Sequence, residues 1–418
     1  MNTLTERELS DQGQASPSAE TGAGLPQALR RAIFLGSLPL GMLGFILPVY
    51  GKEIGADAVQ IGLFFSVFSL MMVLLRPLVG VGLDRYGRRP FVLVGLAGYA
   101  ASMFTFALWG QVWGVVVARA VQGIAAACLW IAVDAITSDV AGAEKRGHAF
   151  GGMGQVSNQG AVLGILIAIA ILMGGLDVAD PWLILFAGYG LAGVAALCVA
   201  WRGLPETYAA APKVKRHPIS WSRSWVMLLL IAGVTSASGA LVGPIVLFFL
   251  QDRLGATAPE VGYAYLPAAL VGAFLSAPLG ALADRFGRKP LMLLGMSVAA
   301  ASSFIIPGLS TLVALAILQV VQSVCGAASG PARQALVADL TGGDQRGRAY
   351  GLYALAGGLG ATVGPLVGGW LYERVSPAAC FYANGFVLAL SVLVLWVFLQ
   401  VPPAPLSEEE PGGGEHQS

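Results

Sequence analysis

Charged residues are scarce in this chain of 418 residues, since only 11% are Asp, Glu, Lys or Arg whereas 56% are hydrophobic. A water-soluble protein of this length needs far more charge to cover its surface. The composition therefore excludes an ordinary soluble protein. The formal net charge of +1 gives no reason to expect nucleic-acid binding.

Histidine and cysteine are also rare, with three and four residues. The histidines lie in predicted loops or in the C-terminal tail, without the spacing of a nucleophile and its base or of metal ligands. The cysteines lie inside apolar runs without paired spacing, so we expect reduced packing residues. The sequence also lacks the Gly-x-x-x-x-Gly-Lys-Ser/Thr loop that binds ATP phosphates. These absences argue against an enzyme, and we expect no metal and no cofactor.

Long apolar runs are abundant instead. They recur at roughly 20 residues, the length that a helix needs to cross a bilayer. The chain is therefore predicted to be an all-α membrane protein with twelve transmembrane helices in two six-helix bundles, residues 27–202 and 225–402. The predicted spans are 28–50, 60–80, 91–108, 112–137, 149–174, 181–202, 225–250, 260–281, 290–308, 311–337, 349–374 and 379–402. The polar segments 1–26 and 403–418 are predicted to be disordered tails, and 203–224 is predicted to be a linker.

The distribution of Lys and Arg predicts the orientation. If the N-terminus lies in the cytoplasm, most of these residues fall in cytoplasmic segments, and only Lys52, Arg253 and Arg374 fall in outer loops. This bias places both termini in the cytoplasm of a bacterial inner or plasma membrane. The first 26 residues also lack a positively charged start followed by a short apolar core, so we expect no cleaved signal peptide.

One segment occurs twice, 200 residues apart. Residues 76–90 read RPLVGVGLDRYGRRP, and residues 276–290 read SAPLGALADRFGRKP. The same offset aligns Gly55 with Gly255, Gln122 with Gln322 and Gly164 with Gly364 without any insertion. Self-similarity at one fixed period indicates a repeat architecture, so we expect one module used twice.

The paired Gly-x-x-x-Asp-Arg-x-Gly-Arg loops resemble the signature loops of the major facilitator superfamily. They lie between predicted spans 2 and 3 and between spans 8 and 9, and the resemblance covers nearly the whole chain apart from its tails. The resemblance implies two six-helix halves that rock around a central site near the membrane midplane. The string LPET at 204–207 is similar to the drug:proton antiporter, or multidrug efflux, branch of that superfamily.

The repeated loops predict a conformational latch that holds the cytoplasmic side shut. Glycine lets helix ends approach closely, and an acid can dock on the positive N-terminal end of another helix. The superfamily resemblance places Asp84 near the start of span 11, at residues 349–351, and Asp284 near 149–151. Alternatively, these charges only enforce topology; we favour the latch because the pattern recurs at fixed spacing. In this latch, Arg88 can pair with Asp139, and Arg288 can pair with Asp339. The predicted latch residues are Gly80, Asp84, Arg85, Arg88 and Asp139 in the first half, and Gly280, Asp284, Arg285, Arg288 and Asp339 in the second.

Span 4 contains a cation, Arg119, in the string RAVQG at 119–123. Such a charge costs about 2.5–3.5 kcal/mol on insertion scales, so we expect it to face a wet cavity. The string is similar to the Arg-x-x-Gln-Gly motif of proton-coupled superfamily members, which implies a coupling role for Arg119 and Gln122. Alternatively, the arginine reaches the outer headgroups. Asp134, on the same predicted helix face, either carries the proton or lies at the cytoplasmic rim.

The two halves differ in a glycine–proline motif. Span 11 contains Gly364-Pro365-x-x-Gly368-Gly369, which resembles the glycine–proline motif that drug:proton antiporters carry in span 5. Span 5 of this chain keeps Gly160 and Gly164 but continues as GILIAI, a departure from the antiporter pattern. Small residues at this spacing predict close helix packing, and Pro365 can bend the helix.

Polar residues within the spans predict a sparsely charged cavity with aromatic edges, which suits amphipathic or lipophilic substrates. We therefore expect a monomeric secondary transporter whose partners are the lipid bilayer, a small-molecule substrate and protons, and which exports a hydrophobic or amphipathic compound. The alternatives are uptake or facilitated transport of a neutral metabolite, and a transporter-shaped receptor that moves nothing. The predicted cavity residues are Trp130, Gln155, Asn158, Gln159, Thr235, Ser236, Ser238, Tyr263, Tyr265, Gln322, Tyr353 and Asn384.

Overall fold

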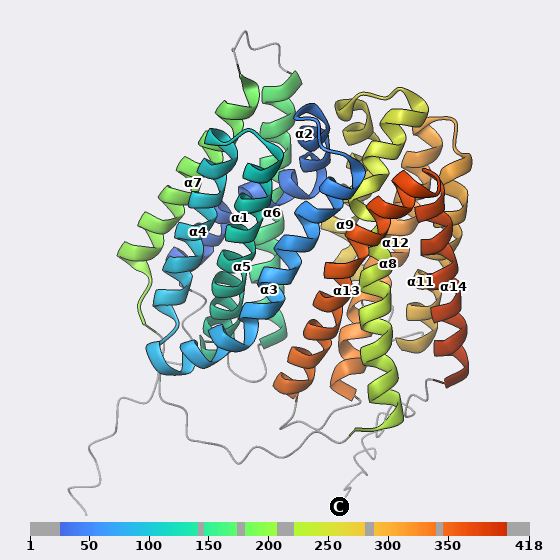
Figure 1. Cartoon of the computed structure of the whole chain (residues 1–418). Helices are drawn as coiled ribbons and strands as arrows, with labels where there is room; N and C mark the ends of the chain where they lie inside the picture. Colours follow the sequence, from blue (N-terminus) through green and yellow to red (C-terminus); the bar gives the residue numbers. More distant parts are fainter. Residues whose placement is uncertain are drawn as a thin grey trace, which may run out of the picture.

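The computed structural model describes residues 26–140, 146–173, 180–206, 221–280, 288–339 and 346–398. They form two neighbouring groups of helices (Figure 1). The N-terminal half contains α1 (Gln27–Phe45), α2 (Leu47–Glu53), α3 (Ala58–Tyr86), α4 (Arg89–Leu108), α5 (Val112–Val140), α6 (Arg146–Met173) and α7 (Pro181–Gly203). The C-terminal half contains α8 (Arg223–Leu254), α9 (Ala258–Gly280), α11 (Arg288–Ile305), the 3₁₀ turn η2 (Ile306–Gly308), α12 (Leu312–Asp339), α13 (Arg346–Arg374) and α14 (Ala379–Phe398).

The helices confirm the predicted all-helical membrane fold. Nine of the described helices are long and apolar enough to cross a membrane, and α1 with α2 forms a tenth, bent span. The helices α9 and α12 occupy the two remaining predicted positions. The predicted tails and most of the predicted linker lie outside the described residues.

Corresponding helices of the two halves begin in the same way. Asp57 caps α3 and exchanges two hydrogen bonds with Gln60, a capping box. At the start of α9, the backbone N–H of Thr257 donates to Glu260 Oε2 at 2.8 Å. This bond corresponds to the one from the Asp57 backbone N–H to the Gln60 side chain, three residues later. The preceding turns use Gly55 and Gly255, both with positive φ, at 84° and 62°. Glycine suits these turns because other residues adopt positive φ only at a cost.

The packing register also repeats at the offset of 200 residues. Between α3 and α5, a methyl group at Gly123 would overlap the carbonyl oxygen of Phe68. Between α9 and α12, the Ser323 hydroxyl donates to the Ala268 carbonyl at 2.7 Å. Both pairs are separated by 55 residues. The sequence repeat is therefore also a repeat of helix packing.

The two ends of the molecule differ in how the halves meet. We call the end where α2 meets α3 the Lys52 end, and the end where α3 meets α4 the Arg88 end. At the Lys52 end, buried apolar residues of both halves form one continuous core. Toward the Arg88 end, each half has a separate core, and the α3 and α13 ribbons draw apart (Figure 1). The halves are therefore joined mainly at the Lys52 end.

Candidate functional site

A cavity of about 850 Å³ lies between α6, α9 and α12, where the two halves face each other. This volume is typical of small-molecule sites. Its walls are mainly apolar, and none of the described residues that line it is charged. The lining residues are Val162, Ile165, Leu166, Ile169 and Ala170 of α6, Gly262, Tyr263, Tyr265, Leu266, Ala268 and Ala269 of α9, and Gln319, Gln322 and Ser323 of α12.

The cavity exists because α6 and α9 make few direct contacts, whereas the corresponding pair, α13 and α3, packs tightly. We call the α3–α13 contact the closed seam and the α6–α9 boundary the open seam. In the closed seam, a methyl group at Gly62 would overlap the Pro365 carbonyl, and one at Gly369 would overlap the Ala58 carbonyl. Glycine at these positions is what lets the two backbones touch.

Three residues of these closed-seam contacts have counterparts in the open seam. At the offset of 200 residues, Gly62 corresponds to Gly262, Pro365 to Ile165, and Gly369 to Ile169. All three counterparts line the cavity. The side chains of Ile165 and Ile169 thus occupy the space where the closed seam has direct backbone contact.

Three polar side chains of α12 reach the cavity, and two of them have partners. Gln319 is hydrogen-bonded to the Tyr265 phenol, and Ser323 donates to the Ala268 carbonyl. For Gln322, no hydrogen bond to another described residue is resolved. Its amide can therefore donate and accept hydrogen bonds inside the cavity.

The predicted cavity residues divide into two groups. Tyr263, Tyr265 and Gln322 line the cavity. On α6, Gln155, Asn158 and Gln159 are exposed and share a helix stripe with Val162, nearer the Arg88 end; their place in the cavity wall stays a prediction.

The other predicted cavity residues bind neighbouring helices or their own helix. Asn384 is only 7% exposed; its amide donates to the Ser303 hydroxyl at 2.7 Å, and its side-chain oxygen accepts from Ser238. The Thr235 hydroxyl donates to the Ile231 carbonyl within α8, at 2.7 Å. Asn384 and Ser238 are buried, so their placement in the cavity was wrong, whereas Thr235 is half-buried and its placement there stays a prediction. Polar groups in a helix bundle often bond a neighbouring helix.

Aromatic and serine positions show the same behaviour. The Trp130 indole donates to the Tyr99 hydroxyl of α4 at 3.3 Å. Ser236 faces Gly357 of α13, and Tyr353 packs against the core of its own half. These side chains tie helices together rather than line the cavity that the structure describes.

The expectation that Arg119 faces a wet cavity was also wrong. Arg119 is 5% exposed and lies between α5 and α3. Its Nε donates to the Phe64 carbonyl at 3.0 Å, and one terminal nitrogen donates to Gln122 Oε1 at 2.6 Å. The guanidinium also lies 4.3 Å from the ring centroid of Phe68. A backbone carbonyl, an amide and aromatic faces thus replace water around the charge.

Asp134 lies on α5, six residues before its end, and its side chain is on the surface of the helix bundle. It interacts electrostatically with Arg76 of α3, the first residue of the repeated segment 76–90. Opposite charges placed on neighbouring helices within the membrane lower the cost of each. The spacing along the sequence could not reveal this pair, because it joins two helices.

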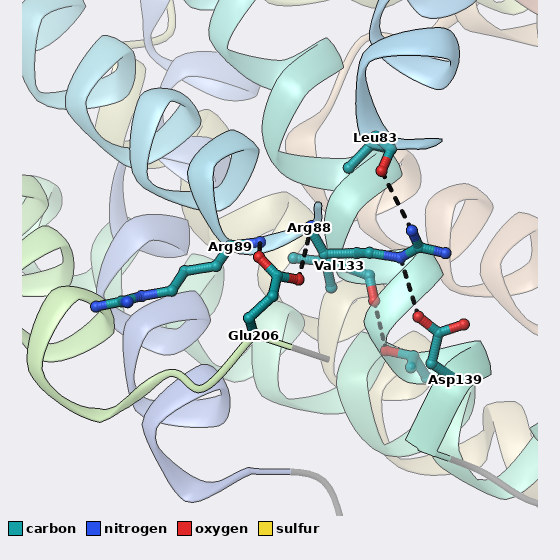
Figure 2. A network of polar contacts seen from close by, with 7 residues as sticks. Leu83, Arg88, Arg89, Val133, Asp139 and Glu206 are labelled. Carbon is teal, nitrogen blue, oxygen red and sulfur yellow. Dashed lines mark hydrogen bonds and ion pairs between the residues drawn. The ribbon is translucent and has the colours of Figure 1, made fainter. Parts of the chain in front are cut away.

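The loop between α3 and α4 is held by a polar network (Figure 2). Arg88 Nε lies 3.0 Å from Asp139 Oδ2, so the expected pair is present. One terminal nitrogen of Arg88 donates to the Leu83 carbonyl at 3.2 Å. The network therefore joins the ends of α3, α4 and α5.

Glu206, which follows α7, completes this network. It accepts hydrogen bonds from the backbone N–H groups of Arg88 and Arg89, at 2.9 and 3.1 Å (Figure 2). A carboxylate at the positive N-terminal end of α4 is favourable. The turn before α4 uses Gly87 with φ of 86°, directly beside this carboxylate. Sequence reasoning noticed only the LPET string, not this role for its glutamate.

The remaining latch residues are less fully described. Asp84 and Arg85 are exposed at the end of α3, with the Arg85 guanidinium 5.3 Å from the Tyr86 ring. Gly80 meets open space, so its predicted close approach was wrong; the neighbouring Gly82 touches Phe91 instead. Asp284 and Arg285 lie outside the described residues, as do the surroundings of Gly280 and the side chains of Arg288 and Asp339.

At the Lys52 end, polar contacts join the halves. Lys52 Nζ lies 2.5 Å from Asp252 Oδ1, and these two residues are themselves 200 positions apart. Within the C-terminal half, the Tyr372 hydroxyl supports Asp252 by donating to its other oxygen at 2.8 Å. Glu373 Oε1 accepts from the backbone N–H of Ala58 at the start of α3, at 3.0 Å. These contacts reinforce the shared core.

Comparison with known proteins agrees with this architecture. The chain is 26% identical to the class E tetracycline resistance protein of Escherichia coli, over 82% of this chain and 86% of that protein. It is 23% identical to multidrug resistance protein 1 of Bacillus subtilis (strain 168), over 86% and 92%.

Solved structures give the same fold. The human organic anion transporter MFSD10 matches with a TM-score of 0.68 at 20% identity, over 89% of this chain and 98% of that one. A point mutant of the nucleoside transporter NupG matches with a TM-score of 0.74 at 13% identity, over 90% and 100%. The family model for the Major Facilitator Superfamily matches residues 32–228 and 228–418. The chain thus belongs to the major facilitator superfamily and is a membrane transporter rather than an enzyme.

Proposed function

We propose that this transporter exports a hydrophobic or amphipathic small molecule in exchange for protons, by alternating access. The observation that carries the proposal is the apolar cavity between the halves, large enough for a drug-sized molecule. The similarity to tetracycline and multidrug resistance proteins supports the direction of transport.

We place the Arg88 end in the cytoplasm, together with both termini. The basic loop between α3 and α4 supports this orientation, because cytoplasmic loops are enriched in Lys and Arg. In this orientation the shared core and the Lys52–Asp252 pair close the outer side. The described conformation would then be the one that receives substrate from the cytoplasm or the inner leaflet.

In the proposed mechanism, Asp134 carries the proton. Protonation removes its negative charge and with it the attraction to Arg76, so proton binding changes the interaction between α5 and α3. Arg119 and Gln122 hold α5 against α3 near the closed seam. This arrangement would transmit a change at Asp134 to the helix that contacts the other half.

Proteoliposomes containing the purified protein test the proposal. A lipophilic dye should move against the direction of an imposed proton gradient, and Asp134→Asn should lose the dependence on the gradient. Asp57→Asn is the matched control, since Asn also caps a helix well. Transport that ignores the gradient would overturn proton coupling.

The latch needs a separate test. In the state closed to the cytoplasm, we propose that Asp84 docks on the start of α13, with its loop held by Arg88, Asp139 and Glu206. Asp84→Asn should slow transport severalfold while leaving the unfolding temperature unchanged. If Asp84→Asn transports at the wild-type rate, the charges of the loop between α3 and α4 only enforce topology.

Uptake of a neutral metabolite is the second candidate. The observation that favours it is the uncharged polar part of the cavity wall, including Gln322 and Ser323. Unlike export, it predicts substrate accumulation inside cells that express the protein. Measuring retention of one labelled substrate in expressing and non-expressing cells separates the two directions.

A further inference from the structure

We propose that the cavity between α6, α9 and α12 selects uncharged ligands that carry a hydrogen-bonding group, that it excludes lipophilic cations, and that Gln322 recognises the ligand. This inference rests on the proposed transport function, because it specifies the substrate class of the same cavity. It starts from a property of the wall: among the residues that the structure describes, none that lines the cavity carries a charge.

A cation entering such a cavity loses its hydration without meeting an opposite charge. Burying an unpaired charge in apolar surroundings is strongly unfavourable, whereas an apolar body gains from leaving water. The aromatic groups on the wall are Tyr263 and Tyr265, and a phenol face offers a cation less than a carboxylate does. The wall therefore favours neutral molecules over cations of the same shape.

The duplication explains why the described part of the cavity wall lacks charge. Gln319 corresponds to Arg119, and Tyr265 corresponds to Phe65. In the first half, the Arg119 guanidinium lies 5.1 Å from the Phe65 ring. In the second half, the corresponding pair is a neutral hydrogen bond between Gln319 and Tyr265. The same contact is kept, but the charge is absent where the cavity lies.

Among the three polar side chains of α12 on the cavity wall, Gln322 has the amide that is available to bind the ligand. Gln319 and Ser323 are engaged with Tyr265 and Ala268, so their hydrogen-bonding capacity is partly used within the wall. Gln322 lies on the cavity between them. An amide that a ligand covers favours a ligand that satisfies it, because an unpaired polar group shut away from water is costly. Gln322 itself is half-buried, and a ligand that fills the apolar cavity would cover its amide. Ligands with an acceptor or donor near Gln322 should therefore bind more tightly than purely hydrocarbon ones.

Two probes of nearly the same shape test the selectivity. Triphenylphosphine oxide is uncharged and has a strong acceptor oxygen, whereas methyltriphenylphosphonium has the same three rings and a positive charge. Affinities for the full chain in lipid nanodiscs can be measured by titration calorimetry without any proton gradient. We expect the oxide to bind at least tenfold more tightly than the phosphonium. Equal or tighter binding of the phosphonium overturns the proposal.

Variants of Gln322 test the assignment of the residue. Gln322→Glu should change the affinity ratio by at least tenfold in favour of the cation, and Gln322→Met should weaken oxide binding about fivefold while still excluding the cation. Gln60→Glu is the matched control: it makes the same change in a capping box at the Lys52 end, where Glu serves equally well. If the ratio of the two affinities is the same in Gln322→Glu as in the wild type, another residue recognises the ligand, and the role proposed for Gln322 is overturned.

The result of this binding test can be distinguished from the result of the transport test of the proposed function. Binding is measured without transport, so oxide-selective binding can hold even if proton-driven export fails in proteoliposomes. Conversely, export of cations by the wild type would leave the transport function intact and overturn the selectivity. Should Gln322→Glu fail to fold, the comparison of the two probes on the wild type and on Gln322→Met still decides.

Discussion

The closed seam and the open seam are built from corresponding helices, yet one is a tight contact and the other a cavity. In both halves, the paired glycines at 160 and 164 and at 360 and 364 receive the backbone of a neighbouring helix of the same half, α1 or α8. The difference begins one residue later, with Pro365 and Gly369 on one side and Ile165 and Ile169 on the other. A few side chains thus decide which boundary between the halves can hold a ligand.

This comparison changes the meaning of the motif that span 5 lacks. As a sequence pattern, GILIAI in place of the glycine–proline motif departs from the antiporter branch. In the structure, two of its three isoleucines, Ile165 and Ile169, face the cavity, whereas Ile167 packs against the core. A branched side chain cannot let two helix backbones touch as glycine does. The absence of the glycine–proline motif from span 5 therefore coincides with the cavity, and it is more than evidence against the antiporter branch.

The strongest test of the comparison is to place an open-seam residue in the closed seam. Gly369→Ile puts a branched side chain where even a methyl group would overlap the Ala58 carbonyl. Overpacking of this kind costs about 1–3 kcal/mol or more, so we expect a clear fall in unfolding temperature and at least a tenfold loss of transport. Gly243→Ala, on α8 in open space, is the control and should keep both near wild type. An unaltered Gly369→Ile protein would mean that the seam is not in tight contact.

The converse change fills the open seam. Ala269→Phe adds a ring to the cavity wall, where there is room for it. We expect at least tenfold weaker ligand binding with little change in stability, since filling a cavity restores contacts that its lining lacks. Calorimetric titration and thermal unfolding of the same sample measure both. A large loss of stability would show that the cavity is not available space.

A third test makes the first half resemble the second at one position. Arg119→Gln reproduces Gln319 and removes the bond to the Phe64 carbonyl and the contact with the Phe68 ring. Losing a charge-assisted hydrogen bond and a cation–π contact costs about 1–3 kcal/mol, partly offset because a buried charge is also removed. We expect a smaller fall in unfolding temperature than in Gly369→Ile. Hydrogen exchange of α3 amides should increase locally, and unchanged exchange would contradict a supporting role for Arg119.

Much of the fold could be predicted because it depends on local patterns. Apolar runs gave the spans, and the offset between Gly55 and Gly255 gave the duplication, since both reflect constraints that recur along the chain. The pair of Arg88 and Asp139 could also be expected from charges at adjacent helix ends. These features need no knowledge of which helices touch.

The site was predicted less completely because it depends on contacts between distant helices. Sequence reasoning treated every intramembrane polar residue as a candidate for the cavity, but Asn384 and Trp130 satisfy neighbouring helices instead. It missed Ile165 and Ile169, because an apolar residue in an apolar span carries no signal by itself. The repeat contained the missing information: these two residues differ from their counterparts in the closed seam, and both line the cavity.

The smallest expected effect concerns the polar contacts that accompany the closed seam at the Lys52 end. Lys52 and Asp252 are each about two-fifths exposed, and an exposed ion pair contributes only about 0.2–1 kcal/mol. Lys52→Asp should therefore shift the balance between conformations by up to about fivefold toward opening at this end, without unfolding the protein. Exchanging the charges, with Lys52→Asp and Asp252→Lys together, should restore most of the balance. Labelling of a cysteine introduced beside the pair measures opening, and equal labelling in the single and double variants would show that the shared apolar core alone holds this end closed.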